Sequence, residues 1–198
     1  MRTLQGKNLP WLIAALVLAV VMNPLLKAIG LLPAYVFKQL GIFYPGLPQL
    51  VFGPLIALLS VVCFLKTRDV MVFPIIGVVR ALSLSYVFPA NLEHSGTGLA
   101  GILAGFIAAG LVKSAGTVQW RTWLPMLAGL YAAIYAAGNY ATTLIFGPAA
   151  QTKIIVATPH LASGVVVGAL ALGAVLGSLA YVAMQQETSE LAGAAVRH

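Results

Sequence analysis

Long apolar runs, separated by short polar or basic stretches, follow one another along the whole chain. Six of these runs approach or exceed the roughly 20 residues that an α-helix needs to cross a bilayer. They lack the apolar–polar alternation of membrane β-strands. The pattern therefore predicts an all-α integral membrane protein, a six-transmembrane-helix bundle that forms one domain over residues 1–198. The expected spans cover residues 10–26, 47–65, 70–88, 97–112, 124–146 and 154–184.

Composition and charge agree with this prediction. Hydrophobic residues make up 61% of the chain and charged residues 8%, with a mean hydropathy of +0.99. Basic residues stand singly beside the apolar runs, so the net charge of +7 indicates control of membrane topology and does not favour nucleic-acid binding. Six spans place seven basic residues on one side (Arg2, Lys7, Lys66, Arg68, Lys113, Arg121, Arg197) and three on the other (Lys27, Lys38, Lys153). We therefore expect an inner-membrane protein with both termini in the cytoplasm.

The segments outside the spans are short. Residues 31–46 are too short to span and are expected to form an outer loop with a helical piece at the interface. The first apolar run lacks a convincing cleavage site, so it is interpreted as a retained span. Cys63 is the single cysteine, which excludes an intrachain disulfide and a CxxC motif.

Polar side chains gather near the expected outer loop between the last two spans, residues 147–153. Tyr131, Tyr135 and Asn139 recur every four residues and so share one helix face, with Tyr140 on a flanking face. The other polar residues near this loop are Thr142, Thr143, Thr158 and His160. Because polar groups are costly in lipid, we expect these helix ends to enclose a binding cavity. The alternatives are core packing for the aromatic stripe and a structural role for the lone histidine.

Two further positions carry candidate chemistry. Arg80 lies near the middle of the third expected span, where it either binds a ligand or is bonded to backbone carbonyls. Glu93 and His94 lie in an expected outer loop, residues 89–98, which either caps a binding site or is simply solvated.

Several kinds of chemistry are not encoded. The chain has no Walker A, HExxH or GxSxG motif and no Cys/His cluster, so we expect neither an enzyme nor a metal or cofactor site. Four acidic residues occur (Asp69, Glu93, Glu187, Glu190), and all lie outside the expected spans. This argues against a carboxylate-based proton-coupled carrier.

The layout resembles the substrate-binding S-component of energy-coupling factor (ECF) vitamin transporters. The similar features are about 200 residues in six spans, the first-span sequence Ala15-Leu16-Val17-Leu18-Ala19, a long first outer loop, and the sequence Tyr44-Pro45-Gly46-Leu47-Pro48 before the second span. The resemblance implies that Ala15 and Ala19 contact a coupling T-component and that two ATPase subunits drive uptake. It also implies a ligand near the outer face, lined by Asn139, Tyr140 and His160 and capped by the loop with Glu93 and His94.

The first functional hypothesis is therefore capture of a small micronutrient. Aromatic residues favour a ligand with a flat ring (Tyr135, Tyr140, Phe43, Tyr44), and Arg80 would meet an anionic group if it reaches the pocket. The alternative is an accessory subunit of a larger membrane complex, using small-residue helix faces for its neighbours. A third hypothesis is a membrane enzyme that uses His94, His160 and Arg80 on a lipid or prenyl substrate.

Overall fold

The computed structural model describes residues 9–28, 33–42, 44–87, 92–115 and 120–195. Within these ranges the regular structure is entirely α-helical. The helices are α1 (Leu9–Ala28), α2 (Pro33–Gln39), α3 (Gln49–Thr67), α4 (Val72–Val87), α5 (Leu92–Ala115), α6 (Trp120–Phe146), α7 (Ala149–Ala157) and α8 (Pro159–Ala195). The predicted all-α class is confirmed for this part of the chain.

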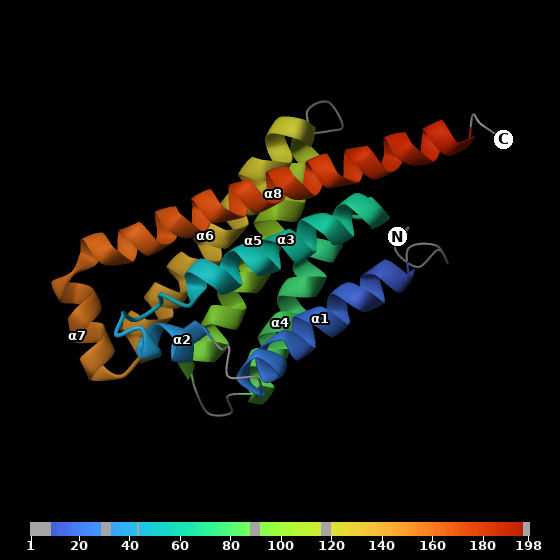
Figure 1. Ribbon diagram of the computed structural model, residues 1–198. Helices are drawn as coiled ribbons and strands as arrows, with labels where there is room; N and C mark the ends of the chain where they lie inside the picture. The colour runs from blue at the N-terminus through green and yellow to red at the C-terminus, as the bar shows by residue number, and fades with distance from the viewer. Residues whose placement is uncertain (1–8, 29–32, 43, 88–91, 116–119, 196–198) are drawn as a thin grey trace.

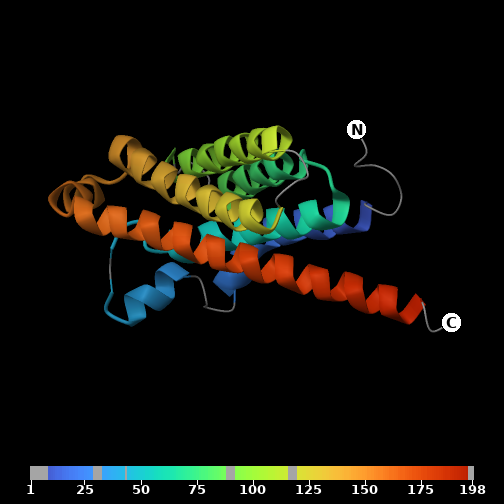
Figure 2. The same ribbon diagram turned by 90° about the horizontal axis from the view of Figure 1, so that it is seen from above.

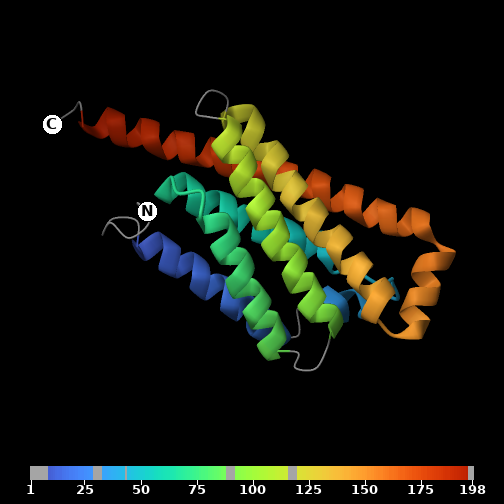
Figure 3. The same cartoon turned by 180° about the vertical axis from the view of Figure 1, so that it is seen from behind.

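The six longer helices form two layers (Figure 1). One layer contains α1, α3 and α8, with α3 packed between the other two. The second layer contains α4, α5 and α6 and crosses the first obliquely, as the view from behind shows (Figure 3). Helix α6 packs against α3 and α8 as well as α5, while α1 packs against α4 across the layers. Helix α6 therefore contacts both layers.

The bundle has two distinct ends (Figures 1 and 2). The short helices α2 and α7 lie at one, here called the α2–α7 end. The link between α3 and α4 lies at the other, the α3–α4 end, where α1 also begins and α8 ends. The six longer described helices run alternately between the two ends, so the start of α1 and the end of α8 lie at the same end.

Small residues allow the helices to approach closely. A Cβ placed on Gly77 of α4 would lie 2.7 Å from the carbonyl oxygen of Gly101 of α5. Between α6 and α8 the contact is reciprocal: a Cβ on Gly129 would lie 2.7 Å from the Leu170 carbonyl oxygen, and one on Gly173 would lie 2.7 Å from that of Ala128. Backbone contact through small residues is typical of helix packing in membranes.

Among the described residues, three helical segments are long and apolar enough to cross a membrane: Gln49–Thr67, Gly96–Ser114 and Pro159–Gln186. The apolar parts of α1 and α4 are shorter, Leu9–Met22 and Val72–Tyr86. Helix α6 is not one of these segments, and tyrosine, threonine and asparagine interrupt its apolar sequence. Exposed large hydrophobic side chains cover the outer faces of α1, α5 and α8. The chain thus has the surface of a membrane-associated helical protein.

Two predicted loops are wrong. Helix α5 begins at Leu92, so the backbone of Glu93 and His94 belongs to its first turn; the intervening polar residues do not stop a helix as proline would. Residues 149–153 of the predicted loop 147–153 belong to α7. Helix α8 begins afresh at Pro159, because proline favours the first helical position and disfavours helix at Thr158 before it.

Candidate functional site

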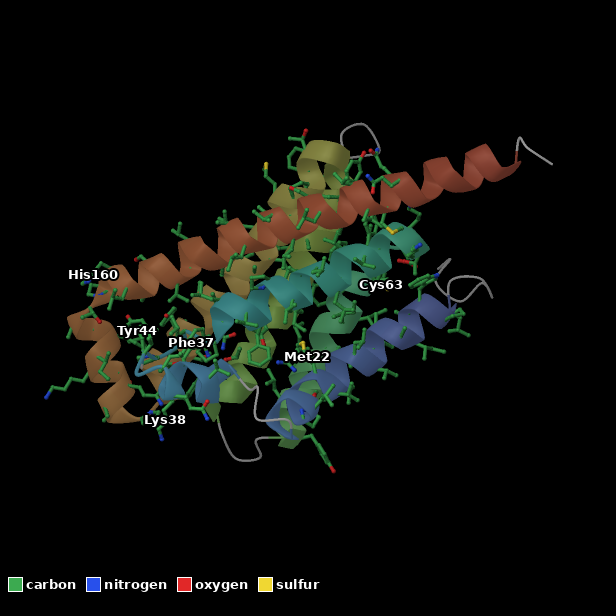
Figure 4. All side chains as sticks on the ribbon, viewed as in Figure 1. Met22, Phe37, Lys38, Tyr44, Cys63 and His160 are labelled. Atoms are coloured by element: carbon green, nitrogen blue, oxygen red, sulfur yellow. The ribbon has the colours of Figure 1, made fainter. Side chains whose placement is uncertain are left out.

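Two tyrosines come together at the α2–α7 end. The ring centroids of Tyr44, in the link before α3, and Tyr140, in α6, are 6.3 Å apart with the rings tilted by 50°. The Tyr44 hydroxyl donates a hydrogen bond of 3.1 Å to the backbone carbonyl of Thr158, where α7 meets α8. Tyr44 thus joins the link before α3 to the α7–α8 junction, and Figure 4 shows it beside these helices.

A glycine makes room for the second tyrosine ring. Gly46 has φ +79°, and a Cβ on it would lie 2.6 Å from Cζ and 2.8 Å from the hydroxyl oxygen of Tyr140. Glycine at position 46 therefore permits both the positive φ and the close approach of the Tyr140 ring. The Tyr140 side chain is 6% exposed and packs with Ile155 of α7 and Val165 of α8. Its hydroxyl is buried and has no hydrogen-bond partner among the described residues.

Asn139 precedes Tyr140 in the chain but contacts a different helix. Its amide nitrogen donates a 2.8 Å hydrogen bond to the Thr97 hydroxyl of α5. Its amide oxygen is buried and has no hydrogen-bond partner within the described ranges. Since adjacent helical residues point about 100° apart, Asn139 and Tyr140 line two neighbouring faces of α6.

Sequence reasoning missed Gln49, the first residue of α3. Its side-chain oxygen is also buried with no partner in the described part of the chain. Gln49 follows Gly46 by three residues, so it lies near the same link as Tyr44. The available signal was a polar residue directly after the Tyr-Pro-Gly-Leu-Pro sequence. Leaving a buried polar atom unsatisfied costs about 1–3 kcal/mol, which makes such atoms candidates for binding.

The nearby threonine hydroxyls are satisfied by their own helices. Thr143 donates to the carbonyl of Asn139 at 2.9 Å, and Thr158 donates to that of Ile154 at 2.7 Å. Thr142 donates to the Asn139 carbonyl as well, at 3.0 Å. This back-bonding is the usual way in which a helix accommodates threonine. These three hydroxyls therefore contribute less to a binding site than the sequence suggested.

Arg80 and Tyr135 lie deeper in the bundle. The Arg80 side chain is 1% exposed, and its guanidinium carbon lies 5.2 Å from the ring centroid of Phe52 in α3. Tyr135 is equally buried and packs against the same phenylalanine. One turn away, the Tyr131 hydroxyl donates to the carbonyl of Gly101 at 3.2 Å. A cation over an aromatic face gives Arg80 a stabilising contact inside the protein.

Of the remaining predicted residues, some are exposed or packed elsewhere in the bundle and others have side chains that are not described. His160 is exposed at the start of α8 (Figure 4). The side chains of Glu93 and His94, and all of Phe43, lie outside the described residues. Ala15 and Ala19 are 3% and 0% exposed, because α1 packs this face against the chain's own core. In this conformation α3 and α4 cover the face that was expected to meet a partner.

The comparison with known proteins gives no further guide, since no family model, curated protein or solved structure matches the chain. Among the described residues, no group of three or more His, Cys, Asp or Glu side chains is arranged to hold a metal ion. The buried polar groups near the two tyrosines are phenol and amide groups beside aromatic rings.

Proposed function

We propose that this protein is the substrate-capture membrane subunit of an ECF-type ABC importer, a six-span bundle that binds a small vitamin-like micronutrient. The observation that carries the proposal is that three buried polar atoms of α3 and α6 have no hydrogen-bond partner in the described residues. These are the Tyr140 hydroxyl, the Asn139 amide oxygen and the Gln49 side-chain oxygen. Hydrogen bonds from a ligand would offset the cost of burying them.

Aromatic surface and hydrogen-bonding groups together favour a ligand with a planar ring. Tyr44 and Tyr140 present tilted rings, and the Tyr140 hydroxyl both donates and accepts hydrogen bonds. The side-chain oxygens of Asn139 and Gln49 accept them. A ring with N–H or O–H groups on its edge satisfies both requirements.

The distribution of charge supports an outward-facing site. Lys66, Arg68 and Lys113 lie at the α3–α4 end, while Lys38 and Lys153 lie near the α2–α7 end. The other basic residues counted for topology fall where side chains are not described: Arg2, Lys7, Lys27, Arg121 and Arg197. An excess of basic residues favours the cytoplasmic side. The proposal therefore places the α3–α4 end in the cytoplasm and the tyrosines outside.

The partners in this proposal, a T-component and two ATPases, rest on the resemblance alone. Ala15 and Ala19 are covered by α3 and α4, so they lend no support to a docking face on α1. Ligand capture by the isolated chain is the part that can be tested directly.

The test is mass spectrometry of small molecules retained by the purified protein. We expect one abundant ligand. Tyr140→Phe should lower the affinity for this ligand about tenfold, because it removes the hydrogen bond between the ligand and the Tyr140 hydroxyl. Tyr86→Phe is the matched control, since the Tyr86 side chain is largely exposed. If the purified chain retains no small molecule, or if both variants bind equally well, the proposed site is wrong.

One observation favours the accessory-subunit alternative. Helices α1, α5 and α8 expose apolar faces of the kind that neighbouring membrane helices cover. This alternative predicts stable co-purification with a large membrane partner and no retained ligand. Ligand retention by the chain alone would count against it.

A further inference from the structure

Helix α1 is attached to the bundle more tightly in its first part than near its end. In the first part, one face is buried against the core through Leu12, Ala15 and Ala19. Of the side chains described after Ala19, Met22 is partly buried and the others are exposed: Val20, Val21, Pro24 and Leu25. Over the described side chains, the end of α1 is therefore held by fewer contacts than its beginning.

A proline interrupts the hydrogen bonds of α1 in this loosely packed part. The helix continues past Pro24 to Ala28. Because proline has no N–H group, the carbonyl of Val20, four residues earlier, loses the donor that an α-helix normally supplies. The proline ring also presses on that carbonyl, which is one reason why sharp bends in helices occur at proline. Helix α1 therefore bends most easily between Val20 and Pro24.

A serine of α4 supplies the missing donor. The Ser83 hydroxyl donates a hydrogen bond of 2.9 Å to the Val20 carbonyl oxygen, and the Ser83 side chain is buried. Serine side chains of neighbouring membrane helices are a common means of bonding a carbonyl that proline has freed. This bond, here called the latch, joins α1 to α4 at the point where α1 bends most easily.

Met22 lies just after the latch and points into the bundle. It packs against Phe52 of α3 and Tyr135 of α6, and Figure 4 shows it on the side of α1 that faces these helices. The Phe52 ring in turn lies 5.2 Å from the guanidinium carbon of Arg80. Methionine is flexible and fills irregular spaces between other side chains. The end of α1 thus covers two buried aromatic rings through a side chain that adapts easily.

We propose that residues 21–28 of α1 form a gate over Phe52 and Tyr135, which turns at Pro24 and is held closed by the latch. This structure is the closed state, in which the latch is formed and Met22 packs against the two rings. In the open state the latch is broken, the end of α1 moves away from α4, and both rings are uncovered on the α1 side. The proposal rests on the contacts of α1 and does not depend on the transport function.

The experiment measures the distance between α1 and α4 in the full-length protein by electron paramagnetic resonance. Spin labels are attached at Leu25→Cys and Tyr86→Cys, two exposed positions, and Cys63→Ala removes the native thiol. Ser83→Ala removes the latch and should lengthen the label-to-label distance by about 3 Å, from a bend of about 20° acting over the roughly 7 Å between Val20 and Leu25. A distance that Ser83→Ala leaves unchanged would overturn the gate.

Ser85→Ala is the matched control, because Ser85 is an exposed serine on the same helix. We expect it to leave the distance between the labels unchanged. An equal shift in both serine variants would show a general loosening of α4 and would refute the role assigned to Ser83.

Pro24→Ala tests the hinge. Alanine supplies an N–H group for the Val20 carbonyl, so α1 no longer depends on the latch at this point. Ser83→Ala should then leave the distance unchanged in the Pro24→Ala protein. A shift as large as the one seen with proline present would show that the gate does not turn at Pro24, and the proposal would be wrong.

Thermal unfolding of the same proteins tests the latch by a second measurement. Ser83→Ala should lower the midpoint temperature by about 2–4 °C with Pro24 present and by less than about 1 °C in the Pro24→Ala protein. Equal losses in the two backgrounds would mean that the hydroxyl does not serve the carbonyl freed by proline. A lower midpoint together with an unchanged distance would show a structural bond without a gate. Either result would refute the proposal.

Discussion

Replacing Gly173 with alanine tests how closely α6 and α8 are packed. The new Cβ would lie 2.7 Å from the Ala128 carbonyl oxygen, about 0.7 Å short of ordinary van der Waals contact, and 2.9 Å from the Cβ of Ala132. Both obstacles belong to α6 and cannot swing aside as a long side chain can. The helices must separate, and a gap of about 0.5–1 Å forfeits a quarter to a half of each contact energy. Overpacking of this kind costs about 1–3 kcal/mol.

Gly164→Ala is the matched control on the same helix. A Cβ on Gly164 meets nothing within 4 Å. Both substitutions gain about 1 kcal/mol in helix propensity, so this contribution cancels when the two variants are compared. The remaining difference in unfolding free energy is the packing cost at Gly173.

The single cysteine provides the assay. Cys63 is buried in α3, so a thiol-reactive fluorogenic dye labels it only when the bundle opens. In the same detergent, we expect the midpoint temperature of labelling for Gly173→Ala to lie about 4–8 °C below that of Gly164→Ala, from a cost of about 2 kcal/mol. Equal midpoints would refute close backbone packing between α6 and α8.

Two further predictions use the same labelling assay. Gly46→Ala should lower the midpoint temperature of labelling more than Gly41→Ala. Both glycines have positive φ, but only the methyl group added at position 46 would meet the Tyr140 ring. Equal effects would mean that backbone strain alone causes the loss of stability. Ser83→Ala should destabilise by about 0.5–1.5 kcal/mol, because the Ser83 hydroxyl donates a 2.9 Å hydrogen bond to a carbonyl of α1, while Ser85→Ala at an exposed position should not; an unchanged Ser83 variant would argue against this link between α1 and α4.

Helix positions were the most predictable part of the fold. The expected spans 47–65 and 70–88 correspond within a few residues to α3 (Gln49–Thr67) and α4 (Val72–Val87). A continuous apolar run has few alternatives in lipid, since each backbone polar group must be bonded within the segment. Helix α7 was missed because its nine residues mix polar and apolar side chains between two prolines, Pro148 and Pro159, which resembles a loop in sequence.

The site was less predictable than the helices that form it. Sequence spacing placed Asn139 and Tyr140 at one depth, yet it could not show that Asn139 contacts Thr97 while Tyr140 contacts Gly46. Which helix faces which residue depends on long-range packing, and nothing in local sequence encodes it. The position of His160 likewise depends on α7, the helix that precedes α8. The sequence of residues 147–153 indicates a loop, so the prediction did not include this helix.

The location of the buried Tyr140 hydroxyl follows from how α6 meets α8 along its length. Toward the α3–α4 end, glycines such as Gly129 and Gly173 bring the two backbones into contact and leave no room for a side chain between them. Toward the α2–α7 end, the space between the helices is filled by the ring of Tyr140, which packs against Val165. A tyrosine there carries a hydroxyl into the interior, where a phenylalanine would fill nearly the same volume without an unsatisfied atom. Packing alone therefore does not account for the hydroxyl, which is why the proposed function assigns it a hydrogen bond with a ligand.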